Sequence, residues 1–461
     1  MTKEKERTYK GIASFDSGKG NTMEITFPKV RPALKFIANL RRLDSYKGEF
    51  GFDWMRDDYQ TICKDYEKLK KEYTPTKIHD KDYFVPWLSM FPQQQNVKLK
   101  LEVEILEGKA RDIDVIKLPK KEGIRFEPEQ VKVNEVESKQ IKIICNSPLS
   151  NDVTIDLLDK NDKKVGAINV VRNANHEQLH FNIIPVRILR SVSKQTDIDI
   201  IEKQIDIEGV ITKNGVKEKI KGWGNKGTDL TEDLKNLENY LNKNSLNQAL
   251  LQCNIGKVYD LIIDEDKWID DNLIIDEGCI FKDTEILEKL HDEFKSQHPI
   301  QAKKRGLVLF LSPLRKGGAG GEGEISEIDA KRFVIYHSNL WDKTSFSHEI
   351  SHVLGLTHSF QKKADKNKVF EYNKYIKEID DYFNSLIKKG TSKSEIAREW
   401  ANYKEGYKVI RSYLNTYYRN PYIFEKTKTE NIMDYSNVRK SFWRYQWKAM
   451  QDDMIKFYNK R

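Results

Sequence analysis

The chain has 461 residues, 33% of them charged, and its 80 Lys plus Arg exceed its 71 Asp plus Glu, which gives a formal net charge of +9. This length has room for two or three domains, each large enough to bury a core of its own. The longest apolar runs, such as residues 306–311, are far shorter than the roughly 20 residues of a membrane-spanning helix, so we expect no membrane span. The basic residues are mixed with acidic ones and no nucleic-acid-binding motif accompanies them, so we expect no nucleic-acid partner.

The first ten residues, M-T-K-E-K-E-R-T-Y-K, are charged and no apolar run follows them. We therefore predict no Sec signal peptide and expect synthesis in the cytoplasm. The four cysteines are widely spaced and form no C-x-x-C pair (Cys63, Cys145, Cys253 and Cys279). We expect buried thiols in a reducing compartment rather than disulfides or a thiolate metal site.

Residues 1–92 give the least distinct pattern and are predicted to form an N-terminal region of unclear fold. An aromatic, glycine-punctuated segment, G-E-F-G-F-D-W, occupies positions 48–54. A helical stretch follows it, in which Tyr59, Ile62, Tyr66 and Leu69 share one face.

Residues 93–222 change to a period of two, which predicts a β-sandwich accessory domain, immunoglobulin-like in type. Between positions 97 and 105, Val, Leu and Ile alternate with Lys and Glu, as in a strand with one solvated face. Further strand-like runs lie at 141–145, 153–157, 165–170 and 179–189, and K-N-G-V at 213–216 predicts a hairpin turn.

Residues 229–461 are predicted to form an α/β unit, which makes the whole chain a multidomain α+β protein. Leucines at 234, 237, 241, 246 and 250 follow a helical period, and strand-like runs follow at 257–263, 306–311 and 333–336. The glycine-rich run at 317–321 is not followed by G-K-[ST], so we predict a mobile loop rather than a phosphate-binding loop.

Residues 348–358, H-E-I-S-H-V-L-G-L-T-H, carry the strongest functional signal. His348 and His352 are four residues apart, so on a helix both imidazoles face one side and reach one ion. Gly355 can take the left-handed conformation that ends a helix, and the turn brings in His358 as a third ligand. Three histidines plus water is the open arrangement of a catalytic zinc, whereas a structural site is closed by a fourth protein ligand. We predict Zn²⁺ as the cofactor, with Glu349 beside it as general base toward a metal-activated water.

The extended H-E-x-x-H-x-x-G-x-x-H motif resembles that of the metzincin zinc metallopeptidases. N-I-M-D-Y-S at 431–436 is similar to the methionine turn of that clan, and G-L-T-H-S-F at 355–360 looks most like the pappalysin and cytophagalysin group. The resemblance covers residues 230–461, and only these two motifs are specific. Ser351 departs from the glycine of many relatives, and the gap between His358 and Met433 is long.

The resemblance implies a metzincin-like zinc endopeptidase domain in residues 229–461. Zinc would be held by His348, His352 and His358, above an apolar floor formed by Met433. Tyr435 would be either a distant zinc ligand or a hydrogen-bond donor to the oxyanion, and Asp434 would brace the turn. Residues 333–338 would be the sheet edge that binds a protein or peptide substrate as an extended strand.

Between the two motifs, residues 368–418 are predicted to form an antiparallel helical hairpin. Apolar residues recur at steps of three and four on both sides of Gly390, and a Ser392-x-x-Glu395 capping box opens the second helix. Over residues 361–430, 16 Lys plus Arg face 10 Asp plus Glu, a net charge of +6. Since the hairpin leaves the chain after His358 and returns before Met433, we hypothesise that it narrows or gates the cleft. A structural brace without substrate contact is the alternative.

Two other functions are compatible with the motifs. The chain could be a non-catalytic, zinc-stabilised binding or structural component, or a zinc hydrolase acting on peptidoglycan peptides; a purely structural site would not need Glu349. The string at 48–54 resembles the leading region of some type VI-like effectors of Bacteroidetes, which implies export by such a system and a secretion-apparatus partner for the N-terminal region. A resident cytoplasmic peptidase explains the missing Sec signal equally well.

Overall fold

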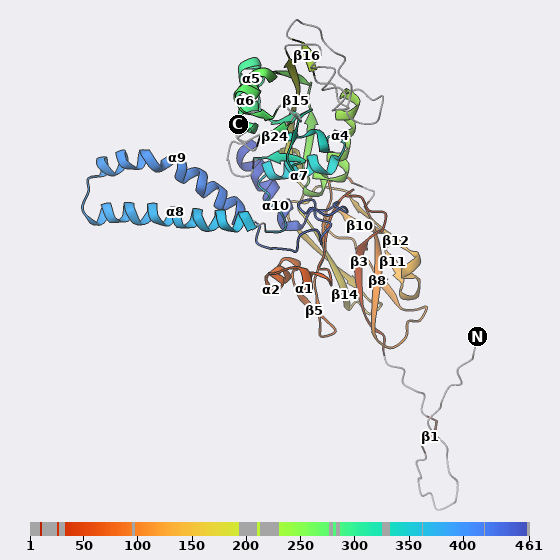
Figure 1. Cartoon of the computed structure of the whole chain (residues 1–461). Coiled ribbons are helices and arrows are strands. Elements are labelled where there is room, and N and C mark those ends of the chain that lie inside the picture. The colour runs from red at the N-terminus through yellow and green to blue at the C-terminus, as the bar shows by residue number, and fades with distance from the viewer. Residues whose placement is uncertain are drawn as a thin grey trace, which may run out of the picture.

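The computed structural model describes residues 10–11, 25–26, 33–94, 97–192, 210–212, 230–275, 280–282, 286–324, 332–361, 363–418 and 420–458. The architecture is mixed α and β with several sheets, as the sequence predicts in outline. Figure 1 shows a β-sandwich, a body of helices around a mostly parallel sheet, and a long pair of helices that projects from the body. Within the described ranges, no helix combines the length and the apolar character that crossing a membrane requires.

The sandwich consists of two sheets that share one core. Their strand orders are β10–β12–β8–β3 and β11–β9–β13–β14–β7–β4. Buried and exposed residues alternate over the first half of β8 (Val97–Glu107), because only one face of the strand meets the core. Leu40, Leu99, Ile143 and Ile155, drawn from both sheets, are fully buried in one cluster. The other strands are β3 (Lys35–Arg42), β4 (Gly51–Asp53), β7 (Trp87–Ser89), β9 (Val115–Lys117), β10 (Ile124–Glu127), β11 (Gln130–Lys132), β12 (Gln140–Cys145), β13 (Val153–Leu158) and β14 (Lys164–Val170).

The sandwich begins further upstream than we predicted, because residues 33–92 supply β3, β4 and β7. Strand β3 pairs with β8 along its whole length, and β4 pairs with β7. The segment at 48–54 is part of this fold: Phe50, Phe52 and Asp53 are all buried. Those three side chains therefore present no surface to a secretion apparatus in the folded protein.

The body is built on a second sheet with the order β16–β15–β21–β24–β23, in which β17 and β18 also pair with β15. All the pairings are parallel except that of β23 with β24. The strands are β15 (His180–Val192), β16 (Val210–Thr212), β17 (Gln252–Ile255), β18 (Tyr259–Asp264), β21 (Leu307–Leu311), β23 (Gly321–Gly323) and β24 (Arg332–Ile335).

Strand β15 corrects our prediction, which placed residues 179–189 in the sandwich. Ile183 to Arg187 of β15 pair with Leu307 to Leu311 of β21, so β15 is a central strand of the body. Six of its apolar side chains are buried, from both faces of the strand, as is usual for a parallel sheet covered on both sides. The predicted hairpin turn at 213–216 lies outside the described residues.

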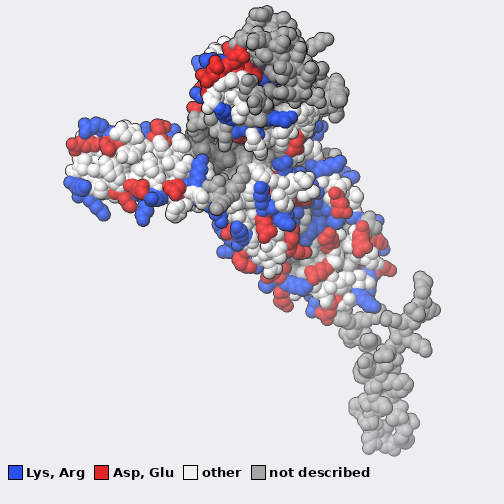
Figure 2. All heavy atoms as spheres, in the orientation of Figure 1, with Lys and Arg blue, Asp and Glu red and all other residues white. Residues whose placement is uncertain are grey.

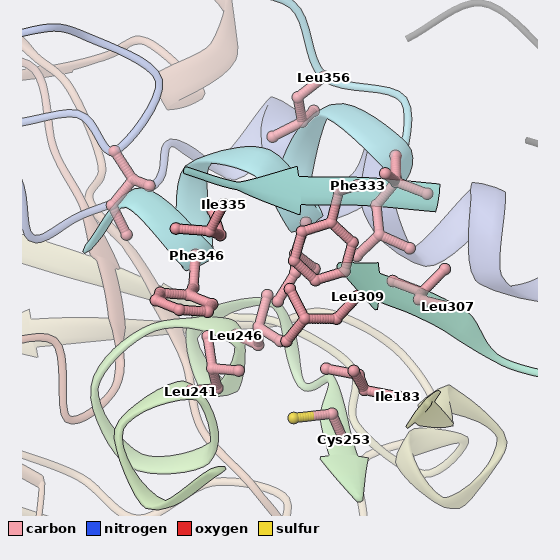
Figure 3. Packing of buried hydrophobic residues seen from close by; sticks show 14 of the residues in the cluster. Ile183, Leu241, Leu246, Cys253, Leu307, Leu309, Phe333, Ile335, Phe346 and Leu356 are labelled. Carbon is pink, nitrogen blue, oxygen red and sulfur yellow. The ribbon is translucent and has the colours of Figure 1, made fainter. Parts of the chain in front are cut away.

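Helices cover this sheet, and Figure 3 shows the resulting core, in which Ile183, Leu309 and Phe333 of the strands lie near Leu241 and Cys253. Phe346 enters the same cluster from the helix that carries the H-E-x-x-H motif. The helices of the body are α4 (Leu230–Asn244), α5 (Glu265–Asp270), α6 (Ile286–Gln297), α7 (Lys343–Val353) and α10 (Arg444–Asp453). Cys63, Cys145 and Cys253 are buried free thiols, as predicted, and Cys279 lies outside the described residues.

Several shorter strands and helices lie outside the two large sheets and the main helices. They are β1 (Lys10–Gly11) with β2 (Ile25–Thr26), β5 (Thr76–Ile78) with β6 (Lys81–Tyr83), the sheet of β19 (Ile274–Ile275), β20 (Ile280–Phe281) and β22 (Arg315–Lys316), and the helices α1 (Tyr59–Ile62) and α2 (Tyr66–Leu69).

The predicted helical hairpin is present as α8 (Lys363–Lys388) and α9 (Lys393–Tyr418), which lie side by side and extend away from the body (Figure 1). Gly390, at a φ of 73°, makes the turn, and Ser392 and Glu395 form the expected reciprocal capping bonds. Val369, Ile376 and Leu414 form a buried cluster between the two helices. Figure 2 shows Lys and Arg interspersed with Asp and Glu along the described surface of the hairpin.

Residues 53–65 join the sandwich to the body through backbone and side-chain contacts. The Lys64 amide donates to the Ile423 carbonyl, and the Glu425 amide donates to the Ile62 carbonyl, both at 2.9 Å. Trp443 Nε1 donates to the Tyr59 hydroxyl at 2.8 Å inside the same core cluster. The two parts of the molecule therefore share buried surface.

Candidate metal centre

Helix α7 positions the first two histidines of the motif. Asp342 caps its N-terminus, since Oδ1 accepts from the Thr344 amide at 3.0 Å. The helix ends at Val353, and Gly355 follows with a φ of 88°, a conformation that glycine adopts without strain. The chain then turns back, which brings His358 beside His348 and His352.

The three imidazoles converge as the sequence predicts. One ring nitrogen from each of His348, His352 and His358 can be chosen so that all three lie within 4.8 Å of one another. The Nε2 atoms of His348 and His352 are 3.1 Å apart. Tetrahedral zinc with Zn–N bonds of about 2.0–2.1 Å holds neighbouring nitrogens about 3.3 Å apart, so this spacing suits one small cation.

The outer nitrogens of two rings are fixed by backbone carbonyls. Nδ1 of His348 lies 2.8 Å from the Ile432 carbonyl, and Nδ1 of His352 lies 2.8 Å from the Leu356 carbonyl. A carbonyl can only accept, so each Nδ1 carries the proton and each Nε2 keeps its lone pair. Two lone pairs that face each other at 3.1 Å repel unless a cation lies between them. The donor set and the orientation of its histidines therefore fit a metal ion.

The methionine turn is bonded to the histidine segment. Met433 is fully buried, its carbonyl accepts from the Ser359 amide at 3.1 Å, and the preceding Ile432 carbonyl is the one that orients His348. Asp434 is also fully buried and accepts from three backbone amides and the Thr429 hydroxyl. Asp434 thus braces the turn, as expected, and has no remaining reach toward the metal site.

Tyr435 lies at the edge of the histidine cluster. Its hydroxyl is 2.9 Å from Nε2 of His358, and its ring packs edge-on against Phe360. The side chain is 38% exposed, so a substrate can reach it. The position is compatible with either predicted role, that of a distant ligand or that of a hydrogen-bond donor.

The three histidines and Glu349 open into a cleft of about 540 Å³. One wall is the glycine-rich loop and strand at 318–323, and the opposite wall is the segment at 435–439. Glu349 itself is 92% buried, next to β23. The glycine-rich loop therefore borders the cleft.

Strand β23 is the free edge of the described sheet, which corrects our assignment of the edge to residues 333–338. Strand β24 pairs with β21 on one side and with β23 on the other, whereas β23 pairs only with β24 among the described strands. Its glycines permit a close approach to α7: a Cβ on Gly323 would lie 2.6 Å from the Glu349 carbonyl oxygen, and one on Gly321 would lie 2.8 Å from Glu349 Cγ.

Our sequence predictions did not include several residues around the metal centre. Asn339, Ser345 and Arg439 line the cleft, and Arg439 pairs with Asp342 at 3.1 Å. Tyr413 and Tyr417 of α9 lie in a smaller cavity with His358. The Y-x-x-x-Y spacing would have placed the two rings on one face of α9, but nothing local indicates that this face meets His358.

No family model matches the chain, and no curated protein is similar to it. Among solved structures, a chain of "Structure of a chaperone-substrate complex" is similar over 47% of this chain and 28% of that chain, with 14% identity and a TM-score of 0.23. This chain thus spans less than a third of that neighbour's length, and so low a TM-score supports no conclusion about fold or function.

Proposed function

We propose that the protein is a zinc-dependent endopeptidase with a metzincin-like catalytic domain. The observation that carries the proposal is the pair of carbonyl-oriented histidines, His348 and His352, whose Nε2 atoms lie 3.1 Å apart and converge with His358 beside Glu349 in an open cleft. When bound, zinc would lower the pKa of a water molecule and polarise the scissile carbonyl.

The protein residues would divide the proton transfers between them. Glu349 would take a proton from the attacking water and return it to the departing amine, so that the peptide bond breaks into a carboxylate and an amine. The Tyr435 hydroxyl lies 2.9 Å from Nε2 of His358. It would donate a hydrogen bond to the negative oxygen that develops on the substrate carbonyl. Met433 would support the histidines from below without ligating.

The substrate would bind in an extended conformation along β23. Residues of β23 line the cleft, and an added strand would satisfy the backbone amides and carbonyls on the unpaired side of β23. A protein or peptide that can unfold locally is the expected substrate class.

The test compares zinc content and cleavage of unfolded proteins for the wild type, Glu349→Ala and His352→Ala. We expect about one zinc per chain in the wild type and in Glu349→Ala, because Glu349 is not a ligand, and loss of zinc in His352→Ala. Cleavage by Glu349→Ala should fall by about 10²- to 10⁴-fold, the usual contribution of a general base. Glu371→Ala, on the exposed face of α8, is the control and should match the wild type.

If Glu349→Ala cleaved at the wild-type rate, Glu349 could not be the general base. Zinc binding without cleavage of any unfolded protein would overturn the endopeptidase. Activity restricted to peptidoglycan peptides would then identify the cell-wall hydrolase, and inactivity on both substrates would favour the zinc-stabilised structural component.

A further inference from the structure

A second cavity, of about 60 Å³, adjoins the metal centre on the far side of His358. His358 lines both this cavity and the main cleft, so the two spaces meet at a metal-binding residue. The walls of the second cavity are formed by aromatic and aliphatic side chains together with three polar residues and His358: Phe360, Tyr413, Tyr417, Ile423, Thr357, Gln361, Asn420 and His358. None of the described lining residues is charged.

One wall of the cavity is held in place by the histidine segment itself. The His358 ring stacks on Phe360, with centroids 5.0 Å apart and planes at 27°. Asn420 Nδ2 donates to the His358 carbonyl at 2.6 Å, and its Oδ1 accepts from the Tyr445 hydroxyl at 2.8 Å. Because these bonds engage the amide of Asn420 within the wall, the cavity offers mainly ring and aliphatic surface.

The other wall comes from the base of the helical hairpin. Tyr413 and Tyr417 are four residues apart, so they lie on one face of the last turns of α9. Tyr413 is fixed by an edge-on contact with Tyr372 of α8 at 5.1 Å and by Lys368, whose ammonium lies 4.6 Å from its ring centroid. The hairpin therefore forms part of the cavity next to the metal site, whatever its distal half does.

We propose that this cavity binds one small aliphatic side chain of the substrate, of the size of alanine or valine, beside the scissile bond. The inference rests on the proposed endopeptidase function and adds a specificity to it. The lining surface is mainly apolar and carries no Asp, Glu, Lys or Arg among the described residues, which favours an aliphatic group over a charged one. The size follows from the volume, since a cavity of about 150 Å³ holds one benzene ring and the 60 Å³ here is well below that volume.

The test is the cleavage-site profile on a mixed peptide library, measured by mass spectrometry for the wild type and two variants that change the cavity in opposite directions. Tyr417→Ala removes one ring and enlarges the space, so cleavage next to Leu and Phe should rise by at least about tenfold relative to Ala and Val. Ile423→Phe fills the space and should shift the preference toward Gly and Ala. Both residues are only partly buried, which limits the cost to folding.

Tyr403→Ala is the matched control, because Tyr403 lies further along α9 and contacts Tyr382 and Phe383 rather than the cavity. Its profile should equal that of the wild type. Identical profiles for the wild type, Tyr417→Ala and Ile423→Phe would overturn the cavity's role while leaving the endopeptidase intact. A wild type that cleaves nothing in the library would instead overturn the proposed function itself.

Discussion

Glu430 is the carboxylate that links the sandwich to the methionine turn. It accepts hydrogen bonds from Arg42 and Arg56, and both guanidinium groups lie over the Trp54 ring. Burial alone would raise the pKa of Glu430, but the charges of the two arginines and their hydrogen bonds outweigh burial and lower it from 4.5 to about 2. The turn that orients His348 begins at the next residue.

The low pKa of Glu430 predicts a loss of stability in acid. Ionised Glu430 stabilises the folded state by about 3 kcal/mol. This contribution is fully present above about pH 4.5 and is lost as the pH falls toward 2, because the carboxylate binds a proton more readily in the unfolded chain than in the folded one. In Glu430→Gln, the free energy of unfolding should start lower at pH 7 and fall less steeply between pH 4.5 and 2.

Denaturant unfolding at a series of pH values measures this difference. Glu425→Gln removes an exposed carboxylate five residues away and should follow the wild type. Burial raises the pKa of Asp53 to about 6. Asp53 is present in every variant, so its contribution to the pH dependence of the free energy of unfolding is common to all the curves. Parallel curves for the wild type and Glu430→Gln would show that the arginine pair does not act through this carboxylate.

At the scale of elements, β23 depends on having no side chain where it crosses α7. A Cβ on Gly323 would lie 2.6 Å from the Glu349 carbonyl oxygen and 3.1 Å from His352 Cβ, so strand or helix must shift. We expect Gly323→Ala to reduce cleavage at least about tenfold and to destabilise the fold by about 1–3 kcal/mol, the usual cost of overpacking. Gly317→Ala, where a Cβ meets nothing within 4 Å, is the control. Equal activity and melting temperature in the two variants would contradict the close approach.

The sequence predicted best those elements whose pattern is local. The hairpin was predicted correctly because a sustained helical period, Gly390 and a capping box fix it without reference to the rest of the chain. The convergence of the three histidines was predictable for the same reason, since helix pitch and one glycine turn set it. Strand β15 was placed in the wrong sheet because a strand buried on both faces has no alternation to read.

The edge strand could not be predicted from its own residues. Gly321–Gly323 contains neither a β-branched nor an aromatic residue, and only its pairing with β24 makes it a strand. Similarly, Phe36, Ile37 and Ala38 of β3 are buried in succession, which hides the period that we used to recognise the sandwich. Such features depend on contacts between distant parts of the chain.

At the scale of the whole molecule, the sandwich and the body should unfold together. Tyr59 and Trp443 share a hydrogen bond inside one core cluster, and Arg42 of the sandwich contacts Glu430 of the body. Ile143→Ala, in the sandwich core, should therefore lower the temperature at which the proposed zinc ion is released, although Ile143 is remote from the candidate metal site; such truncations cost about 2–5 kcal/mol.

Calorimetry measures the unfolding of the protein, and a zinc-sensitive dye measures the release of the proposed zinc ion over the same temperature range. The control is Ile387→Ala, on the exposed part of α8 near the hairpin turn, which should leave zinc release unchanged. Unfolding of the sandwich in Ile143→Ala at a temperature where zinc is still bound would show that the two parts are independent.

The turn between α8 and α9 is also a place where the polypeptide chain can be cut. Residues 387–390 are exposed, the turn lies at the far end of the projecting helices, and the two halves of the candidate site are bonded directly to each other within the body, between His348 and Ile432 and between Ser359 and Met433. Loop tips of this kind tolerate cuts and insertions. The protein is thus suited to a split design, in which one fragment carries the three histidines, the other carries the methionine turn, and reassembly of the two restores the site.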